Sequence, residues 1–190
     1  MRTERNHRKY NNYMKRTLAH IHRVQNNMLK IVTDFKEDLQ LSDEDCRILM
    51  HSVLNHDRSK FSKKQFYAYV ELTELYHQRR VLGNTEYDYD NPEIRTQVEE
   101  AVADHYEQEN HHPERLQAGE KFHHFEAMET FCDLQAMAEE FNEGSCRNFY
   151  ENVWKKKQVK YFSDDFNWFS TTTTIETLMY LFERHYELNS

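Results

Sequence analysis

The scarcity of glycine and proline is the feature that most limits what this chain can fold into. Three glycines and two prolines occur in 190 residues, so there are few points at which regular structure has to break. Between those points the apolar residues recur every three or four positions, which is the period of an amphipathic helix and differs from the alternation of a strand. The sequence therefore predicts an all-α fold, a bundle of about six to seven helices.

Local signals place the ends of these helices. Ser42 with Asp45, and Ser62 with Gln65, have the spacing of capping boxes, and an Asn-Pro pair at 91–92 can cap and start a later helix. We expect helices at about 11–38, 42–56, 62–78, 92–109, 121–143, 146–157 and 173–187. The stretch 159–172 is expected to be an irregular cover over the core.

The length fits one compact domain. We therefore expect a single domain over residues 1–190, with its core in about 11–157 and the C-terminal helix at about 173–187 packed on it. Aromatic residues make up 14% of the chain, which is too many for a disordered chain. The core is expected to consist of Phe, Tyr, Leu and Met side chains.

Charge and cysteine content argue against several classes of protein. The formal net charge is −8, which disfavours broad binding to nucleic acid. Three cysteines are too few for a disulfide framework and indicate a reducing compartment. No stretch approaches the ~20 apolar residues of a membrane span. We expect no membrane partner and a cytoplasmic location, in the host cytoplasm if the gene is viral.

Several polar residues fall where an apolar helical stripe should continue. His20, His56 and His105 each lie three or four residues from a valine of such a stripe, and Asp133 continues a phenylalanine stripe. With Asp57 beside His56, these side chains are expected to reach one interior from four helices. A single core histidine is explained by a hydrogen bond, but burying the whole set without a cation costs several kcal/mol per unpaired group. The set therefore predicts a metal site.

Two further histidines, His111 and His112, precede Pro113 in a turn. Adjacent side chains cannot share one helical face, so both could serve one site only from the irregular backbone that the proline supplies. A pair exposed on the surface is the alternative. Imidazole with carboxylate suits manganese, iron or zinc, with magnesium as a further alternative. The set could hold one or two divalent ions, and two would deprotonate a water and clamp a phosphoryl group.

These residues resemble the pattern of the HD-domain metal-dependent phosphohydrolases. His20 in AHIHRV, the pair His56 and Asp57 in NHDRSK, and Asp133 in FCDLQAM occur in the order of that family. The resemblance implies an all-helical HD-domain fold and assigns these four residues to one metal ion. His22, about 200° from His20 around the helix, is the rival ligand.

HDRSK also resembles the HDxxK form of the HD-GYP branch, in which a lysine near the metals contacts the phosphate. Lys60 matches that lysine, although a salt bridge from Lys60 to Asp57 is an equal alternative. The additional histidines and the glutamate of the branch are matched by His105, His111, His112 and Glu114. This likeness implies that the three histidines complete a second ion site. No GYP signature follows, so specificity for cyclic dinucleotides is not carried over.

The wider pattern HDRSKF, DHYEQENHHPE and METFCDLQAM, over about residues 14–157, is also similar to a family of small phage and bacterial proteins of unassigned activity. The resulting expectation is a metal-dependent phosphohydrolase that cleaves a phosphomonoester or phosphodiester of a nucleotide with a metal-activated hydroxide. Asp57, Lys60 and His105 are expected to be catalytic, with Lys60 stabilising the developing charge and a histidine protonating the leaving oxygen.

Two alternatives stay open at this point. The first is a non-enzymatic interaction protein of phage type that binds a host protein on a metal-binding HD-like scaffold. The second is a metal-free bundle in which the histidines form a polar network. Besides the small phosphorylated substrate, a homodimer and a host-protein partner are both compatible with the sequence.

Overall fold

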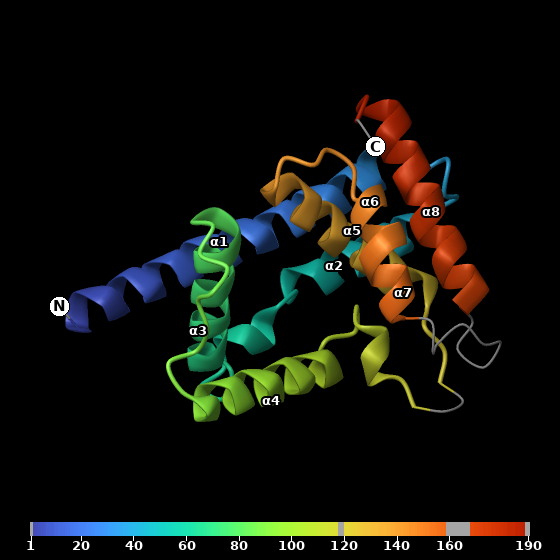
Figure 1. Ribbon diagram of the computed structural model, residues 1–190. Coiled ribbons are helices and arrows are strands. Elements are labelled where there is room, and N and C mark those ends of the chain that lie inside the picture. The colour runs from blue at the N-terminus through green and yellow to red at the C-terminus, as the bar shows by residue number, and fades with distance from the viewer. Residues whose placement is uncertain (1, 118–119, 159–167, 189–190) are drawn as a thin grey trace. The chain divides into compact units, whose positions relative to one another are not determined.

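The computed structural model describes residues 2–117, 120–158 and 168–188. Regular structure in these ranges is entirely helical, and no strand occurs in them (Figure 1). When the continuous run 147–157 is counted as one helix, the described residues form seven helices of eleven residues or more. The all-α prediction is therefore confirmed. Most of the predicted irregular cover, 159–172, lies outside the described residues.

The chain forms two compact units. Unit 1 comprises Met1–Ala19 and Asp57–Glu109, and unit 2 comprises His20–His56 and Asn110–Ser190. The long first helix α1 (Arg2–Asp34) contributes its N-terminal part to unit 1 and the rest to unit 2. The expectation of a single domain over 1–190 stays a prediction.

Unit 1 is built around aromatic side chains. In addition to the start of α1, this unit contains the 3-10 turn η1 (Arg58–Phe61), α3 (Phe66–Tyr76), the π-helical turn η2 (His77–Val81) and α4 (Pro92–Gln108). Helices α3 and α4 pack together and lie at a steep angle to each other in Figure 1. The buried apolar core of this unit consists of Tyr13, Ala68, Tyr69, Val70, Val98 and Ala101. The cap predicted for α4 is confirmed, because the Asn91 side chain accepts the Ile94 N–H at 2.9 Å.

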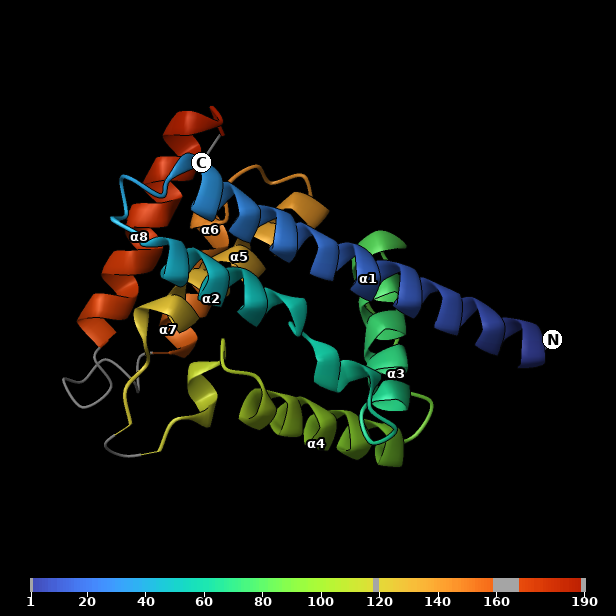
Figure 2. The same ribbon diagram turned by 180° about the vertical axis from the view of Figure 1, so that it is seen from behind.

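Unit 2 is built around α5 (His124–Glu140). Helix α2 (Asp43–Leu54) packs on α5, and the rest of α1 runs beside α2 in Figure 2. The C-terminal helix α8 (Trp168–His185) packs along α5. The remaining elements are the 3-10 turn η3 (Pro113–Arg115), α6 (Arg147–Phe149), the π-helical turn η4 (Tyr150–Trp154) and α7 (Lys155–Lys157). The core includes Val24, Met28, Ile31, Leu49, Val53, Phe131, Ile175, Leu178 and Phe182.

The two predicted capping boxes have different outcomes. At the start of α2 the box is complete, since Ser42 Oγ accepts the Asp45 N–H at 3.1 Å and Asp45 Oδ2 accepts the Ser42 N–H at 2.9 Å. At Ser62 only half of the box forms. Ser62 Oγ accepts the Gln65 N–H, but the Gln65 side chain donates to Asp104 on α4 at 2.6 Å. Helix α3 therefore begins later than predicted.

Other helix ends also differ from the predicted ones. Helix α1 covers residues 2–34 instead of 11–38, and Tyr10, ahead of the predicted start, packs against the core of unit 1. Helix α5 covers 124–140 instead of 121–143, and the left-handed backbone at Asn142 (φ 56°) ends it ahead of Gly144. Helix α8 begins at 168 instead of 173.

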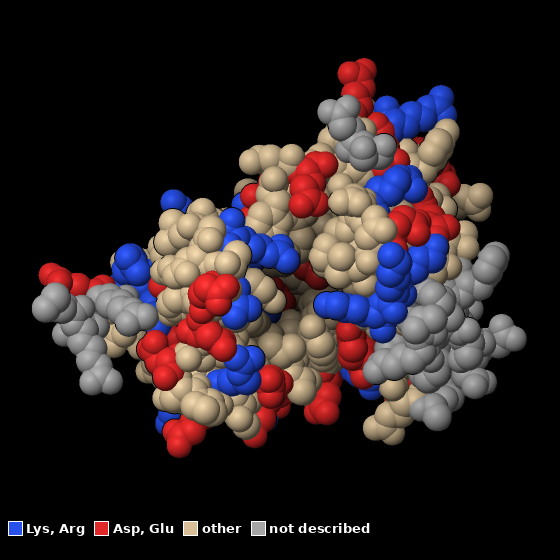
Figure 3. All heavy atoms as spheres, in the orientation of Figure 1, with Lys and Arg blue, Asp and Glu red and all other residues tan. Residues whose placement is uncertain are grey.

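The described helices and surface bear on the expected partners. None of these helices is long and apolar enough to cross a membrane. On the face drawn in Figure 3, acidic and basic side chains are interspersed. Such a mixed surface differs from the one-sign field with which proteins attract a polyanion over a broad area.

The three cysteines are free, and we expect them to differ sharply in reactivity. Burial raises the pKa of the Cys146 thiol to about 12 and that of Cys132 well above its ordinary value, so both lack the reactive thiolate. Cys46 is only partly buried. Iodoacetamide at about pH 8 should alkylate one thiol per folded chain, and all three after unfolding in guanidinium. Peptide mass spectrometry should place the fast adduct on Cys46, and rapid labelling of Cys132 in the folded chain would contradict this packing.

Candidate metal centre

Two carboxylates one turn apart on α5 form the base of the site. Glu129 and Asp133 lie in a largely buried stretch of the helix, at the i, i+4 spacing that puts both on one face. Glu129 is 5% exposed, and the Asp133 side chain is 22% exposed. A carboxylate in such surroundings costs free energy unless it is paired or hydrogen-bonded. Its partners therefore decide what the site can do.

His20, on α1, pairs with Asp133. Its Nε2 lies 2.9 Å from Asp133 Oδ1, and the residue is buried. Burial raises the pKa of the Asp133 carboxyl, but the hydrogen bond and charge of His20 outweigh this effect, and the pKa falls below its ordinary value. The rival His22 is exposed, with Nδ1 3.2 Å from Asn26 Nδ2. Of the two histidines, His20 is therefore the one that faces α5.

His56, just after α2, lies between the two carboxylates. Its Nδ1 is 3.0 Å from Glu129 Oε1, and its Nε2 is 3.8 Å from Asp133 Oδ1. Burial raises the pKa of Glu129, yet the imidazoles of His111 and His56 beside it lower it more, to about 2. An ionised carboxylate can only accept hydrogen bonds, so His56 Nδ1 carries a proton and donates it. In a neutral His56 the lone pair is then on Nε2, the nitrogen nearer Asp133.

His20, His56 and Asp133 fit a divalent metal ion. Each offers one ligand atom, and these atoms lie within 4.8 Å of one another. Two ligands about 2.1 Å from one ion are roughly 3.0–3.4 Å apart at right or tetrahedral angles, which the 2.9 Å and 3.8 Å contacts of Asp133 Oδ1 bracket. A ligating histidine usually donates its other N–H to a carboxylate, and Glu129 occupies that position. Two imidazoles and a carboxylate suit manganese, iron or zinc.

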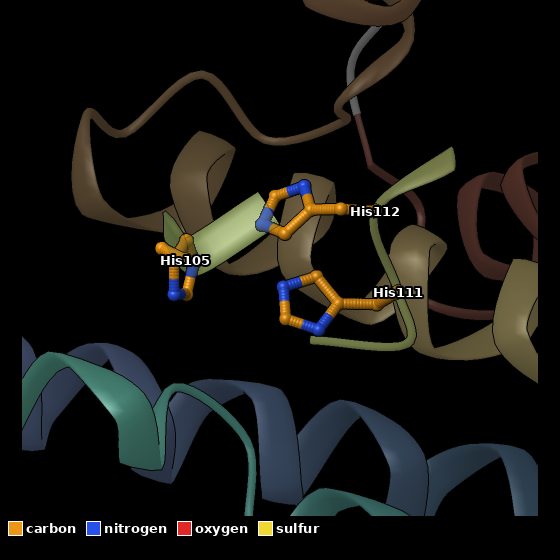
Figure 4. Close-up of side chains that lie close together, drawn as sticks. All are labelled: His105, His111 and His112. Atoms are coloured by element: carbon orange, nitrogen blue, oxygen red, sulfur yellow. The ribbon is translucent and has the colours of Figure 1, made fainter. Parts of the chain in front are cut away.

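His111 and His112 lie in the segment between α4 and η3. Figure 4 shows the two rings on the same side of this segment, and their centroids are 4.2 Å apart. The extended backbone at His112 (φ −103°, ψ 113°) allows this, as the sequence predicts for an irregular turn. The His111 carbonyl accepts a hydrogen bond from Thr130 Oγ1 at 2.8 Å, and its Nδ1 lies 3.4 Å from Glu129 Oε1. His111 is buried with its ring 4.3 Å from that of His56, whereas His112 is half-buried.

In unit 1, a second polar cluster surrounds Asp57. This residue has a φ of 60°, a left-handed conformation that Asp adopts more readily than most residues, and it directly precedes η1. Residues three apart are eclipsed in a 3-10 turn, which aligns Asp57 with Lys60. Lys60 Nζ lies 2.6 Å from Asp57 Oδ2, so the salt bridge, one of the two alternatives for Lys60, is formed. His105 Nε2 lies 3.3 Å from the other oxygen, Oδ1.

Ser59 and Glu109 hold this second cluster together. Ser59 Oγ lies 2.7 Å from His105 Nδ1, and the Ser59 backbone N–H donates to Glu109 Oε1 at 3.1 Å. The ring of His105 is thus held at both nitrogens, with Nε2 toward Asp57. This arrangement orients the imidazole within unit 1.

The structure brings part of the predicted set together in each unit. Within unit 2 it gathers His20, His56, His111 and Asp133, with His112 next along the chain. Within unit 1 it gathers Asp57, Lys60 and His105. The assignment of Asp57 to the first metal ion, and of His105 with His111 and His112 to a second, stays a prediction.

Sequence reasoning missed Glu129, Ser59 and Glu109. Each had a local signal, because Glu129 precedes Asp133 by four residues and Glu109 follows His105 by four. Ser59 lies inside HDRSK itself. An acid one helical turn from a predicted ligand is a candidate for its outer hydrogen-bond partner.

Comparison with known proteins gives a family and no activity. The family of unknown function DUF5662 matches residues 9–179, a range that includes every candidate ligand. No curated protein and no solved structure matches the chain. The likeness to HD-domain phosphohydrolases stays a prediction.

Replacing His20 by Ala should remove a metal ligand, whereas His22→Ala, on the same helix, should not. Added manganese or zinc should raise the melting temperature of the wild type, because an ion that binds only the folded state stabilises it by about 2.7 kcal/mol at 100 times its Kd. His22→Ala should keep this shift and His20→Ala should lose it. Elemental analysis after desalting should find bound metal in the wild type and in His22→Ala but little in His20→Ala. Equal metal content in both variants would contradict the site.

Glu129→Gln should weaken metal binding without removing a ligand. The amide is the same size but no longer offers His56 a charged acceptor, so the ring is less firmly oriented. Competition with a chelating dye should show affinity about 10- to 100-fold lower. Glu139→Gln is the matched control, because Glu139 is on the same helix and pairs with Lys30. An affinity unchanged in Glu129→Gln would remove Glu129 from the site.

Proposed function

Because the chain belongs to the DUF5662 family of unknown function, its chemistry has to be argued from the site, and we propose that it is a metal-dependent phosphohydrolase. The substrate class is a phosphomonoester or phosphodiester of a nucleotide. One observation carries the proposal: His20, His56 and Asp133 converge within ligand distance, and the tautomer of His56 is set by Glu129.

The chemistry of these donors supports hydrolysis at phosphorus. A divalent ion held by imidazole and carboxylate supplies a Lewis acid that activates water and polarises a phosphoryl oxygen. Asp133 contributes negative charge, and its low pKa keeps it ionised at neutral pH. Glu129 accepts a hydrogen bond from His56 Nδ1, which leaves the other ring nitrogen, Nε2, available as a metal ligand.

The roles proposed for Lys60 and His105 come from the resemblance to the HD-domain enzymes. Lys60 donates to Asp57 and lies over the Tyr69 ring, 5.3 Å from its centroid. These contacts support the salt bridge, and the contact of Lys60 with a substrate phosphate rests on the resemblance alone. The donation of a proton by His105 to the leaving oxygen also rests on the resemblance alone. We also propose a cytoplasmic location, which the cysteine content favours.

The test is a hydrolysis screen on protein purified without chelator. Elemental analysis comes first, and the same sample is then assayed with p-nitrophenyl phosphate, bis(p-nitrophenyl) phosphate and a panel of nucleotides. We expect metal-dependent release of product from at least one of them. Asp133→Asn should lower the rate about 100-fold or more, since the ion contributes several kcal/mol of transition-state stabilisation.

Glu139→Gln serves again as the control, because it changes a carboxylate on the same helix outside the ligand set. Its rate should equal that of the wild type. A metal-loaded wild type that releases no product from any member of the panel would overturn the enzymatic proposal and favour the interaction protein. Full activity in Asp133→Asn would place the chemistry elsewhere.

A further inference from the structure

Arg23 differs from the other arginines of unit 2. In that unit Arg47, Arg115 and Arg147 pair with carboxylates, and Arg184 donates to the Tyr180 hydroxyl. The guanidinium of Arg23 has neither a hydrogen bond nor an ion pair with any residue that the structure describes. Arg23 is half-buried, and its Nη1 is fully buried without an acceptor.

The sequence of α1 explains why Arg23 has no partner on its own helix. Between Glu4 and Asp34 the helix contains no acidic residue. The residues one turn away from Arg23 are Ala19, His20, Asn26 and Asn27. Of the two amide oxygens among these, Asn27 Oδ1 accepts from Lys30 Nζ at 3.1 Å.

The position of Arg23 connects it with the metal centre. It follows His20 by three residues on α1, and side chains at this spacing are neighbours, with Cβ atoms about 5–6 Å apart. The His20 imidazole faces Asp133. The long and permanently charged side chain of Arg23 therefore starts beside the candidate metal ligand His20, within unit 2.

An unsatisfied guanidinium N–H in a buried position costs free energy, and an oxyanion would satisfy it. The planar fork of Arg matches two oxygens of a phosphoryl group, and it remains charged at any physiological pH. We propose that Arg23 binds the non-bridging oxygens of the substrate phosphoryl group beside the metal centre. This assignment rests on the proposed phosphohydrolase function and names its substrate-binding residue.

The assignment predicts a separation between metal and substrate binding. Arg23 supplies no ligand atom, so its replacement should leave metal content unchanged. It should raise KM and weaken the binding of inorganic phosphate, because the lost bonds are made to a charged group. Arg23→Lys retains the charge and loses the two-pronged geometry, so its effect should be intermediate.

The experiment measures inorganic phosphate binding to the metal-loaded full chain by titration calorimetry, with acetate as a second probe. Wild type, Arg23→Gln, Arg23→Lys and the control Lys15→Gln are compared. Lys15 is an exposed cation on the same helix, so its replacement changes net charge equally. We expect about 10-fold or greater loss of phosphate affinity in Arg23→Gln, a smaller loss in Arg23→Lys and none in Lys15→Gln. Metal content should be equal in all four, and acetate should bind more weakly than phosphate.

The outcomes separate this inference from the proposed function. If the wild type hydrolyses phosphate esters and Arg23→Gln matches Lys15→Gln in phosphate affinity and KM, Arg23 is not the binding residue, although the enzyme stands. If the wild type binds phosphate through Arg23 without hydrolysing any ester, the anion site stands and the enzymatic proposal fails. A metal-loaded wild type that binds no phosphate overturns the inference. Should Arg23→Gln fail to fold, Arg23→Lys gives the same comparison.

Discussion

The structure of unit 2 depends on how two carboxylates are accommodated inside α5. Glu129 and Asp133 lie in the most buried stretch of this helix, and each would be costly without a partner. Histidines from two other segments satisfy them: His20 from α1 and His56 after α2. Removing one partner from a buried pair leaves the other charge uncompensated. These pairs therefore specify how α1 and α2 lie against α5, which the non-directional apolar core does not do.

The helices were predictable where their signals are local. The complete capping box at Ser42 and the Asn-Pro start of α4 involve residues within a few positions of each other, and both are present. The box at Ser62 failed because the Gln65 amide finds an acceptor on another helix, Asp104. A partner 39 residues away leaves no trace in a local pattern. The early start of α1 has the same origin, since Tyr10, ahead of the predicted start, packs on Phe66 of α3.

The sequence predicts only those site residues that occupy a position where an apolar helical stripe should continue. His20, His56 and Asp133 do so, and the structure brings them together. Glu129 lies between Met128 and Thr130 and close to Glu126, so the local sequence does not show that it is buried, which depends on the face of α5 that is covered. The choice between two roles for Lys60 needed the backbone. The helix does not continue through HDRSK, and a left-handed Asp57 followed by a 3-10 turn aligns the two side chains.

A hydrogen-bonded histidine network and a metal centre make different demands on the same atoms. In a network, each donor should face an acceptor within about 3.2 Å, and the pairs His20 with Asp133 and His56 with Glu129 satisfy this. The contact between His56 Nε2 and Asp133 Oδ1 does not, because 3.8 Å is longer than a hydrogen bond. A divalent ion between these two atoms could be bound by both of them. His20, His56 and Asp133 lie close enough together to hold a metal ion, and Arg23, one turn from His20, adds a buried donor with no acceptor among the residues that the structure describes.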